Sequence, residues 1–398
     1  MDKVIFSILL VGWLLGQVVQ IPIAGRDIPI MDIAVALTIA IGGVLLLLSK
    51  HWRELTTWPI FWAWGIFIVI ALVSLLVGVN TLPAASVVGA SLFWVRLALY
   101  GCLPWVIFVN FKSDPKVYQG WLLGALVAVS VIGFLQLGLF PTLEPWEMFG
   151  WDPHRYRLFA TWLDPNFLGI WLALGLGLAL IKWPAGSSHQ VVRMLTIGLI
   201  VAALGWTVSR SALITAVVAL LVWAAIYYRK LIGWLGLVVL VGAILLVSPA
   251  LRQRVINTGQ LGDTVGYRIE SWARGWQTFT THPWLGVGYN MLPYLSQPSS
   301  QPSSDATIGR ADSGFDGSLL TIAATTGAVG LTAWLWFVWQ VLVLGWQGIT
   351  HRQLFGTWLL IATAGLLVGS LFINAWLYSP ILSLWLVGLG LSLRERYG

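Results

Sequence analysis

Long apolar runs alternate with short polar connections along most of this sequence. Between Val4 and Pro249 the runs are close to helix-spanning length, and then a polar stretch, 250–316, interrupts them before further apolar blocks and a basic tail. A helix needs roughly 20 apolar residues to cross the ~30 Å hydrocarbon core of a bilayer. The pattern therefore predicts a bundle of transmembrane helices with one long connection.

We divide the apolar runs into twelve predicted spans. Their boundaries are 4–23, 30–49, 57–78, 90–109, 118–140, 163–182, 191–208, 211–228, 231–249, 318–345, 355–376 and 379–393. The expected fold class is an all-α integral membrane protein of about 12 transmembrane helices. It divides into a nine-span region at 1–249, the long loop at 250–316, and three spans with a tail at 317–398.

Composition supports this class. Hydrophobic residues make up 58% of the chain and charged residues 9%, whereas soluble domains carry roughly 25% charge. The basic residues lie at span ends, one or two at a time, which argues against a nucleic-acid partner. The single Cys102 excludes a disulfide framework. The first apolar block lacks a small-residue cleavage site, so we interpret it as a retained span rather than a signal peptide.

The distribution of basic residues predicts the orientation of the spans. With the N-terminus inside, the cytoplasmic segments contain all six lysines of the chain. The basic residues of the opposite segments are all arginines: Arg26, Arg155, Arg157, Arg210, Arg252, Arg254, Arg268, Arg274 and Arg310. Because positive charge favours the cytoplasmic side of short loops, this sorting predicts cytoplasmic N- and C-termini and an extracytoplasmic long loop.

Three segments on the predicted outer face carry candidate chemistry: 141–166, the joint "VSRSAL" around Arg210, and the long loop. Arginine suits an anionic substrate because its planar fork binds phosphate oxygens in pairs and stays charged. A charge between two closely spaced spans costs a few kcal/mol unless it is used or paired. Arg210 is therefore a candidate phosphate ligand, and the alternative is an arginine that reaches to lipid headgroups.

The long loop contains an amphipathic stretch, "GYRIESWARGWQTF", which predicts an interfacial helix over 266–280. Its apolar face, Ile269, Trp272, Trp276 and Phe279, is expected to be buried. Arg268 and Arg274 lie on the same stretch, either as phosphate ligands or as a solvated polar face.

The sequence "TWLDPNFLG" has the pattern of a helix start, with Asp164 at the cap and a proline after it. Asp164 and Asn166 can be purely structural, or Asn166 can hydrogen-bond a sugar or phosphate. Both remain candidates for substrate binding.

Four motifs together resemble the O-antigen ligase and O-antigen polymerase family of bacterial envelope enzymes. They are "RLFATWLDPNFLG", "VSRSALI", "YRIESWARGWQTFTTHPWLGVGYN" and "GSLLTIAATTGAVGL", which follow one another between about 157 and 331. Each motif alone is weak, whereas the ordered set is specific to the family. The resemblance implies a GT-C-like multi-span fold in a bacterial cytoplasmic membrane, with the active face extracytoplasmic.

The family transfers an oligosaccharide or polysaccharide from a polyprenyl diphosphate carrier to an acceptor hydroxyl. The resemblance implies inversion at the anomeric carbon, no metal and no cofactor, and an acceptor that is a glycan, a lipid or a protein. Arginines at positions matching Arg210 and Arg268 hold the diphosphate in the family, and we add Arg157 and Arg274 as candidates. One dominant loop favours a ligase over a polymerase.

The chain departs from the family at the expected catalytic histidine. The family commonly has a His-Asn pair eleven residues before the first glycine of a "GxxG" motif, and here Asp316 and Gly317 occupy those positions. Asp316 can accept the proton of the acceptor hydroxyl, and Asp312 is a second candidate. The alternative is that Asp316 only caps the tenth span.

Two other function classes stay open. A cyanobacterial branch of the family carries the label of inorganic-carbon transporters, and a transporter should show charge near the middle of the membrane. Arg96 is the ionisable residue well inside a predicted span, and the sequence shows no evident carboxylate partner for it. The missing histidine also allows a non-catalytic scaffold, in which Asp316 and Arg268 would be dispensable.

Overall fold

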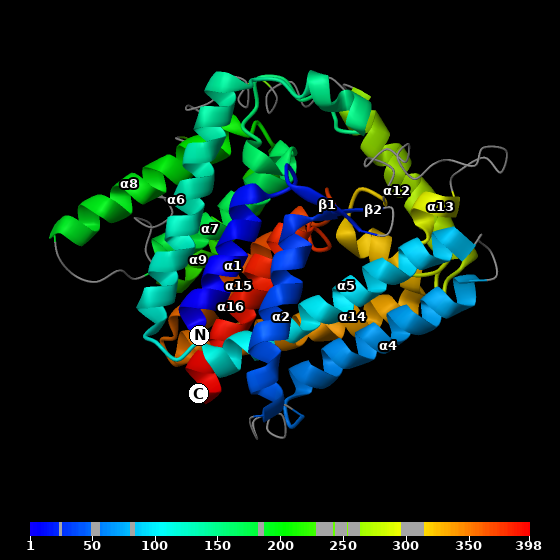
Figure 1. The fold of residues 1–398 in the computed structure, drawn as a ribbon, viewed down its shortest axis with the longest axis horizontal. Helices are drawn as coiled ribbons and strands as arrows, with labels where there is room; N and C mark the ends of the chain where they lie inside the picture. Colours follow the sequence, from blue (N-terminus) through cyan, green and yellow to red (C-terminus); the bar gives the residue numbers. More distant parts are fainter. Residues whose placement is uncertain are drawn as a thin grey trace.

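The computed structural model describes residues 1–23, 26–48, 56–79, 84–181, 187–227, 242, 253, 263–295 and 314–398. Within these residues the regular secondary structure is helical apart from one two-stranded hairpin, and irregular segments such as 282–291 and 370–378 connect the helices (Figure 1). The elements in chain order are α1 (Asp2–Leu15), β1 (Gln20–Ile23), β2 (Arg26–Pro29), α2 (Ile30–Leu48), α4 (Pro59–Gly78), α5 (Ala84–Asn110), α6 (Pro115–Leu139), η2 (Glu144–Phe149), η3 (Ala160–Trp162), α7 (Pro165–Leu180), α8 (Ser187–Trp206), α9 (Arg210–Tyr227), α12 (Asp263–Thr281), α13 (Leu292–Leu295), α14 (Ser318–Thr350), α15 (Leu354–Gly369) and α16 (Ser379–Tyr397).

The helices have the length and apolarity that a membrane protein requires. Among the described residues, six helices are long and apolar enough to cross a membrane, namely α4, α5, α6, α8, α9 and α14. Shorter apolar helices lie at 30–44, 165–180 and 354–369. The class predicted from the sequence, an all-α membrane protein, is confirmed, whereas the number of twelve spans stays a prediction. The predicted span 231–249 lies outside the described residues except for residue 242.

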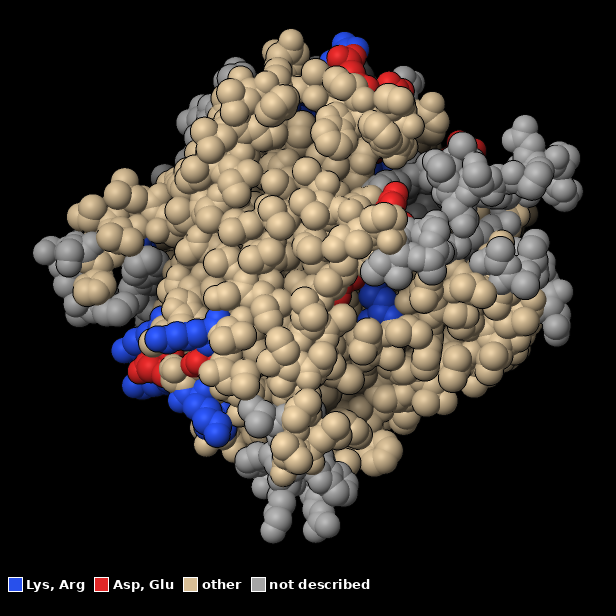
Figure 2. All heavy atoms as spheres, in the orientation of Figure 1, with Lys and Arg blue, Asp and Glu red and all other residues tan. Residues whose placement is uncertain are grey.

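The centre of the bundle is formed by α7 and α16. Almost every side chain of α7 is buried, and so are all residues of α16 from Ser379 to Leu393. Helix α16 packs against α5 and α15, and α7 packs against α9. Around this centre, apolar side chains face outward from α2, α4, α6 and α8, as lipid contact requires. Most of the surface in Figure 2 is uncharged, and a dense group of charged side chains lies near the two chain ends.

Two predicted spans have the wrong ends. The span predicted at 4–23 stops at Leu15, because Gly16 adopts a φ of 55° and the next two amides donate to the carbonyl of Thr161. The chain then forms the β1–β2 hairpin, in which Gln20 pairs with Pro29. The span predicted at 355–376 stops at Gly369, and residues 370–378 form an irregular connection to α16.

Helix α14 is kinked at Gly327, where φ is 67° and ψ is −170°. The kink accommodates the segment 283–288, which follows α12. Val287 donates to the carbonyl of Ala324 at 3.0 Å, and Ala328 donates to the carbonyl of Pro283 at 2.7 Å. A side chain at Gly327 would collide with the backbone of Trp284. Two of the family motifs therefore meet here through backbone hydrogen bonds, which explains their glycines.

The predicted amphipathic helix is present as α12. The protein itself does not bury the apolar face as expected, because Ile269 and Trp276 are 54% and 61% exposed. Instead the small residues Ser271 and Gly275 are buried, and a side chain at Gly275 would meet Leu320 of α14. Close helix packing selects small residues, so the apolar side chains point outward, as on an interfacial helix.

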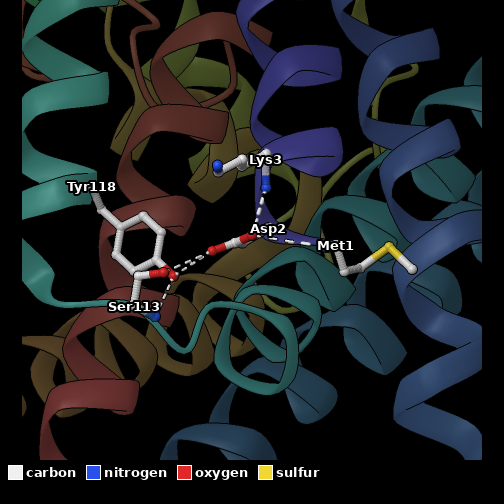
Figure 3. A network of polar contacts seen from close by, with 5 residues as sticks. All are labelled: Met1, Asp2, Lys3, Ser113 and Tyr118. Carbon is white, nitrogen blue, oxygen red and sulfur yellow. Dashed lines mark hydrogen bonds and ion pairs between the residues drawn. The ribbon is translucent and has the colours of Figure 1, made fainter.

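At the end of the bundle near the two termini, α1 is tied to the connection between α5 and α6 (Figure 3). The carboxylate of Asp2 accepts hydrogen bonds from Ser113 Oγ and from the hydroxyl of Tyr118, both at 3.0 Å. Partial burial opposes ionisation of Asp2, but hydrogen bonds from Lys3, Ser113 and Tyr118 outweigh it and lower its pKa.

Candidate functional site

The candidate residues gather at one end of the bundle, formed by the segment 141–164, the starts of α7, α9 and α14, and the polar face of α12. We call this the site end. Three contacts join its segments: the amide of Leu158 donates to the carbonyl of Trp206 at 2.9 Å, Arg157 reaches Thr207, and the amide of Asp316 donates to Ser271 Oγ at 2.9 Å.

Arg157 is buried and forms contacts on three sides. Its Nε donates to the carbonyl of Thr207 and its Nη2 to Oδ1 of Asn166, both at 2.8 Å. Its Nη1 lies 3.3 Å from Nδ1 of His154. Because a guanidinium can only donate, we assign Nδ1 as the acceptor and place the ring proton on Nε2. Arg157 thus connects the segment 141–164 to the α8–α9 joint and to α7.

Asp164 is the N-cap of α7 and accepts a hydrogen bond from the amide of Asn166 at 2.7 Å. The predicted structural role is therefore present. Burial is the largest influence on this carboxyl and raises its pKa to about 6, although the cap hydrogen bond and Arg157 oppose the rise. The side-chain oxygen of Asn166 is already occupied by Arg157.

Arg268 of α12 lies within electrostatic range of Arg210, Asp164 and Asp316. Desolvation, the largest effect, lowers the pKa of Arg268; the two carboxylates oppose this shift and Arg210 adds to it. Arg210 begins α9 after a tight joint in which Val208 has a φ of 51° and Ser209 Oγ accepts from the amide of Ala212 at 3.3 Å. The fold therefore brings together two guanidinium groups that are 58 positions apart in the sequence.

Asp316 does not cap α14. The N-cap is Gly317, with no side-chain cap hydrogen bond, so the capping alternative is wrong. Burial raises the pKa of Asp316, with Arg268 and Arg274 opposing the rise and Asp152 adding to it. The carboxyl is thus desolvated and flanked by arginines, an environment typical of functional acids and bases.

The remaining candidates differ in position. Arg274 is exposed and forms an i,i+4 ion pair with Glu270 at 3.0 Å. Asp312 lies outside the described residues. Asp152 is a residue that the sequence interpretation missed, although it lies within electrostatic range of Arg157 and Asp316 and burial raises its pKa. Its sequence context, Asp-Pro within "GWDPHRYR", repeats the Asp-Pro of the α7 cap and was the available signal.

In the part of the chain that the structure describes, no group of three or more His, Cys, Asp or Glu side chains is arranged to hold a metal ion. The described charged groups of the site end are instead arginines and carboxylates, which suit recognition of phosphate and proton transfer.

Fold and site together define a multi-pass membrane protein with an arginine–carboxylate cluster at one end of its helical bundle. The family model described as O-antigen ligase matches residues 195–335. This match supports the O-antigen ligase and polymerase family and confirms the resemblance carried by the motifs. No curated protein matches the chain. The match supports membrane glycosyltransferase activity of the O-antigen ligase or polymerase type, and the family implies glycan or lipid-linked substrates. Together with the apolar helices it points to a multi-pass bacterial membrane protein.

Proposed function

We propose that the protein transfers an oligosaccharide or polysaccharide from a polyprenyl diphosphate carrier to an acceptor hydroxyl at the site end. The observation that carries this proposal is that Arg268 lies within electrostatic range of both Arg210 and Asp316. Two like charges repel each other, so their proximity favours an anion that binds between them. A diphosphate supplies such an anion, and the guanidinium forks match its oxygens.

In the proposed reaction the acceptor oxygen attacks the anomeric carbon, and the bond from that carbon to the diphosphate oxygen breaks. The leaving polyprenyl diphosphate takes the bonding electrons, and Asp316 takes the acceptor proton. Attack opposite the leaving group inverts the anomeric configuration. Arg210 and Arg268 stabilise the charge that develops on the diphosphate without reorganising, which is the most effective form of electrostatic catalysis.

The orientation follows from the charge distribution. The lysines Lys3, Lys112 and Lys116 belong to the end that carries the termini, whereas the site end carries arginines. By the positive-inside rule, the termini are cytoplasmic and the site faces the extracytoplasmic side, where the long loop 250–316 also lies. The domain division and the twelve spans predicted from the sequence are part of this proposal. A glycan-repeat polymerase is the alternative within the family.

The transporter alternative came from the label of one family branch, with Arg96 as the charge inside a span, and a specific contact of Arg96 argues against it. Asp32 of α2 lies 3.8 Å from Arg96, which also donates to the carbonyl of Leu377. The intramembrane charge is thus neutralised and held between helices α2, α5 and α16. A translocated ion or solute needs a group that can change partners, and this one is fixed on two sides.

The test is glycan transfer by the reconstituted protein from a polyprenyl diphosphate oligosaccharide to a panel of acceptors. Arg268→Ala should abolish transfer, and Arg268→Lys should lower it about 10- to 100-fold if the grip uses both nitrogens of the fork. Asp316→Asn should lower it at least ~100-fold. Arg155→Ala is the matched control, since Arg155 is exposed and pairs with Glu144 away from Arg268.

Full activity of Asp316→Asn would remove the proposed base, and full activity of Arg268→Lys would remove the bidentate grip. Loss of activity in the Arg155 control as well would show that the assay reports general damage to this end of the protein.

A further inference from the structure

Residues 370–379, which comprise the irregular connection between α15 and α16 and the first residue of α16, contact three segments of the site end: α12, the start of α14 and the start of α7. At the start of α14, the amide of Ser318 donates to the carbonyl of Ser370 at 2.7 Å, and the amide of Trp376 donates to Ser318 Oγ at 3.0 Å. Ser318 follows Asp316 by two residues. On α12, the ring of Trp272 lies 6.0 Å from that of Phe372.

The third contact runs through Tyr378 to the start of α7. Its ring stacks on Phe167 with 4.1 Å between centroids and 5° between planes. Its hydroxyl donates to the carbonyl of Trp162 at 3.3 Å. Phe167 and Trp162 flank the cap formed by Asp164. The connection 370–379 therefore fixes the spacing between the Asp164 cap, the Asp316 segment and α12.

Both neighbours of Tyr378 are held by the intramembrane ion pair. Arg96 donates to the carbonyl of Leu377, and Ser379 Oγ donates to Oδ1 of Asp32 at 2.7 Å. The hydroxyl of Tyr100 donates to the same carboxylate oxygen at 2.7 Å. The Asp32–Arg96 ion pair thus holds the residues on both sides of Tyr378. Its two members lie on α2 and α5, which carry none of the site residues.

An ion pair within the bundle is expensive, because both charges lose their hydration, and its net contribution to stability is often near zero. The main effect of the ion pair is instead to fix the geometry of the residues that it hydrogen-bonds. The hydrogen bonds of the pair hold residues 377 and 379 in one arrangement, and an apolar substitute of the same volume would supply packing without that geometry.

We propose that Asp32 and Arg96 are positioning residues for the glycan-transfer site. They act through Tyr378 and the connection 370–379, which sets the distance between the Asp164 and Asp316 segments. This inference rests on the proposed function for its catalytic consequence, whereas its geometric content is independent of that function.

The experiment compares two identical substitutions on α16. Ser379→Ala removes the hydrogen bond to Asp32, and Ser383→Ala removes a hydrogen bond of similar length, 2.9 Å, that Ser383 accepts from Trp13, together with one that it donates to the carbonyl of Pro380 in its own helix. Both serines are buried in the same helix, at 3% and 0% exposure. Comparing the two serine variants separates a positioning effect from a general weakening of α16.

The geometric measurement uses spin labels at Glu147→Cys and Gln277→Cys in a Cys102→Ser background, since both labelled positions are exposed. The label distance reports the spacing between the segment 141–164 and α12. Ser379→Ala should broaden or shift the distance distribution, and Ser383→Ala should leave it as in the unsubstituted protein. Equal distributions in all three proteins would overturn the positioning role.

The kinetic measurement is glycan transfer by the same proteins. Ser379→Ala should lower kcat about 10- to 100-fold with little change in KM, because misplacement of reacting groups by about 1 Å costs that much. Equal losses in both serine variants would assign the effect to helix stability and overturn the proposal. If the unsubstituted protein transfers no glycan, the proposed function fails while the label distances still decide the positioning claim.

A second pair of variants covers the case in which Ser379→Ala does not fold. Tyr378→Phe keeps the stack on Phe167 and loses only the hydroxyl, whereas Tyr378→Leu loses the stack. The distance distribution and kcat should be near normal in Tyr378→Phe and altered in Tyr378→Leu. Normal behaviour of Tyr378→Leu would overturn transmission through this residue.

Discussion

Replacing Arg157 by lysine separates two roles that the sequence alone could not distinguish. Arg157 was predicted as a diphosphate ligand, but in the structure its guanidinium contacts Thr207, Asn166 and His154. A hydrogen bond that involves a charged group contributes about 1.5–3 kcal/mol. Lysine can keep the charge but reaches only one of the partners well, so Arg157→Lys should lower the free energy of unfolding by about 3–6 kcal/mol.

The measurement is the thermal unfolding midpoint of the purified protein in detergent, followed by tryptophan fluorescence. Arg155→Lys, two positions away, is the control. Arg155 is 66% exposed and pairs with Glu144, and an exposed ion pair contributes about 0–1 kcal/mol. Arg157→Lys should unfold several degrees lower than Arg155→Lys. Equal midpoints, together with a selective loss of glycan transfer in Arg157→Lys, would refute the structural role and restore Arg157 as a substrate ligand.

Three further predictions follow from single groups. Asp164→Asn keeps the cap, since asparagine caps as well as aspartate, and removes a carboxyl whose pKa is about 6. Because this pKa is raised in the native state, the native protein loses stability as pH rises from 3.8 to about 6. In unfolding measurements the variant should therefore gain up to about 3 kcal/mol of stability at pH 7.5 and nothing at pH 3.5. Gly327→Ala should lower stability by at least ~1–3 kcal/mol because of its backbone conformation, whereas Gly124→Ala, which meets no neighbouring atom, should not. The acid limb of glycan transfer should lie above the pH expected for an exposed aspartate, because Asp316, the proposed base, has a raised pKa, and a limb near pH 4 would contradict that assignment.

The sequence predicted the helices well because lipid imposes a simple rule: each span satisfies its own backbone and exposes apolar side chains. The same rule cannot tell where an apolar segment stops being helical inside the protein. Residues 20–23 and 370–376 adjoin apolar runs, although they include Gln20, Pro22, Ser370 and Asn374. Contacts with residues distant in sequence divert the chain here: Gln17 and Val18 donate to Thr161, and Trp376 donates to Ser318.

The candidate site was predicted in part for a similar reason. Arginines on one face could be recognised from residue type and loop position, and the structure brings Arg268 near Arg210, Asp316 and Asp164. The sequence could not show that the partner of Arg96 is Asp32, which lies 64 residues earlier on another helix. Nor could it show that the guanidinium of Arg157 donates its hydrogen bonds to other residues of the protein.

The mixture of arginines and carboxylates at the site end fits a site that must both hold and release an anion. In the structure Asp164 and Asp316 lie near Arg268 and partly offset its charge. In the proposed reaction, an arriving diphosphate adds negative charge beside Asp316, and like charges raise the pKa of a carboxyl. Asp316 then becomes a stronger base while the acceptor hydroxyl approaches. Once the proton is transferred, Asp316 is neutral and no longer competes with the diphosphate for Arg268. The arginines are therefore most available to the phosphates when the leaving group gains its charge, which is the condition for stabilising the transition state more than the substrate.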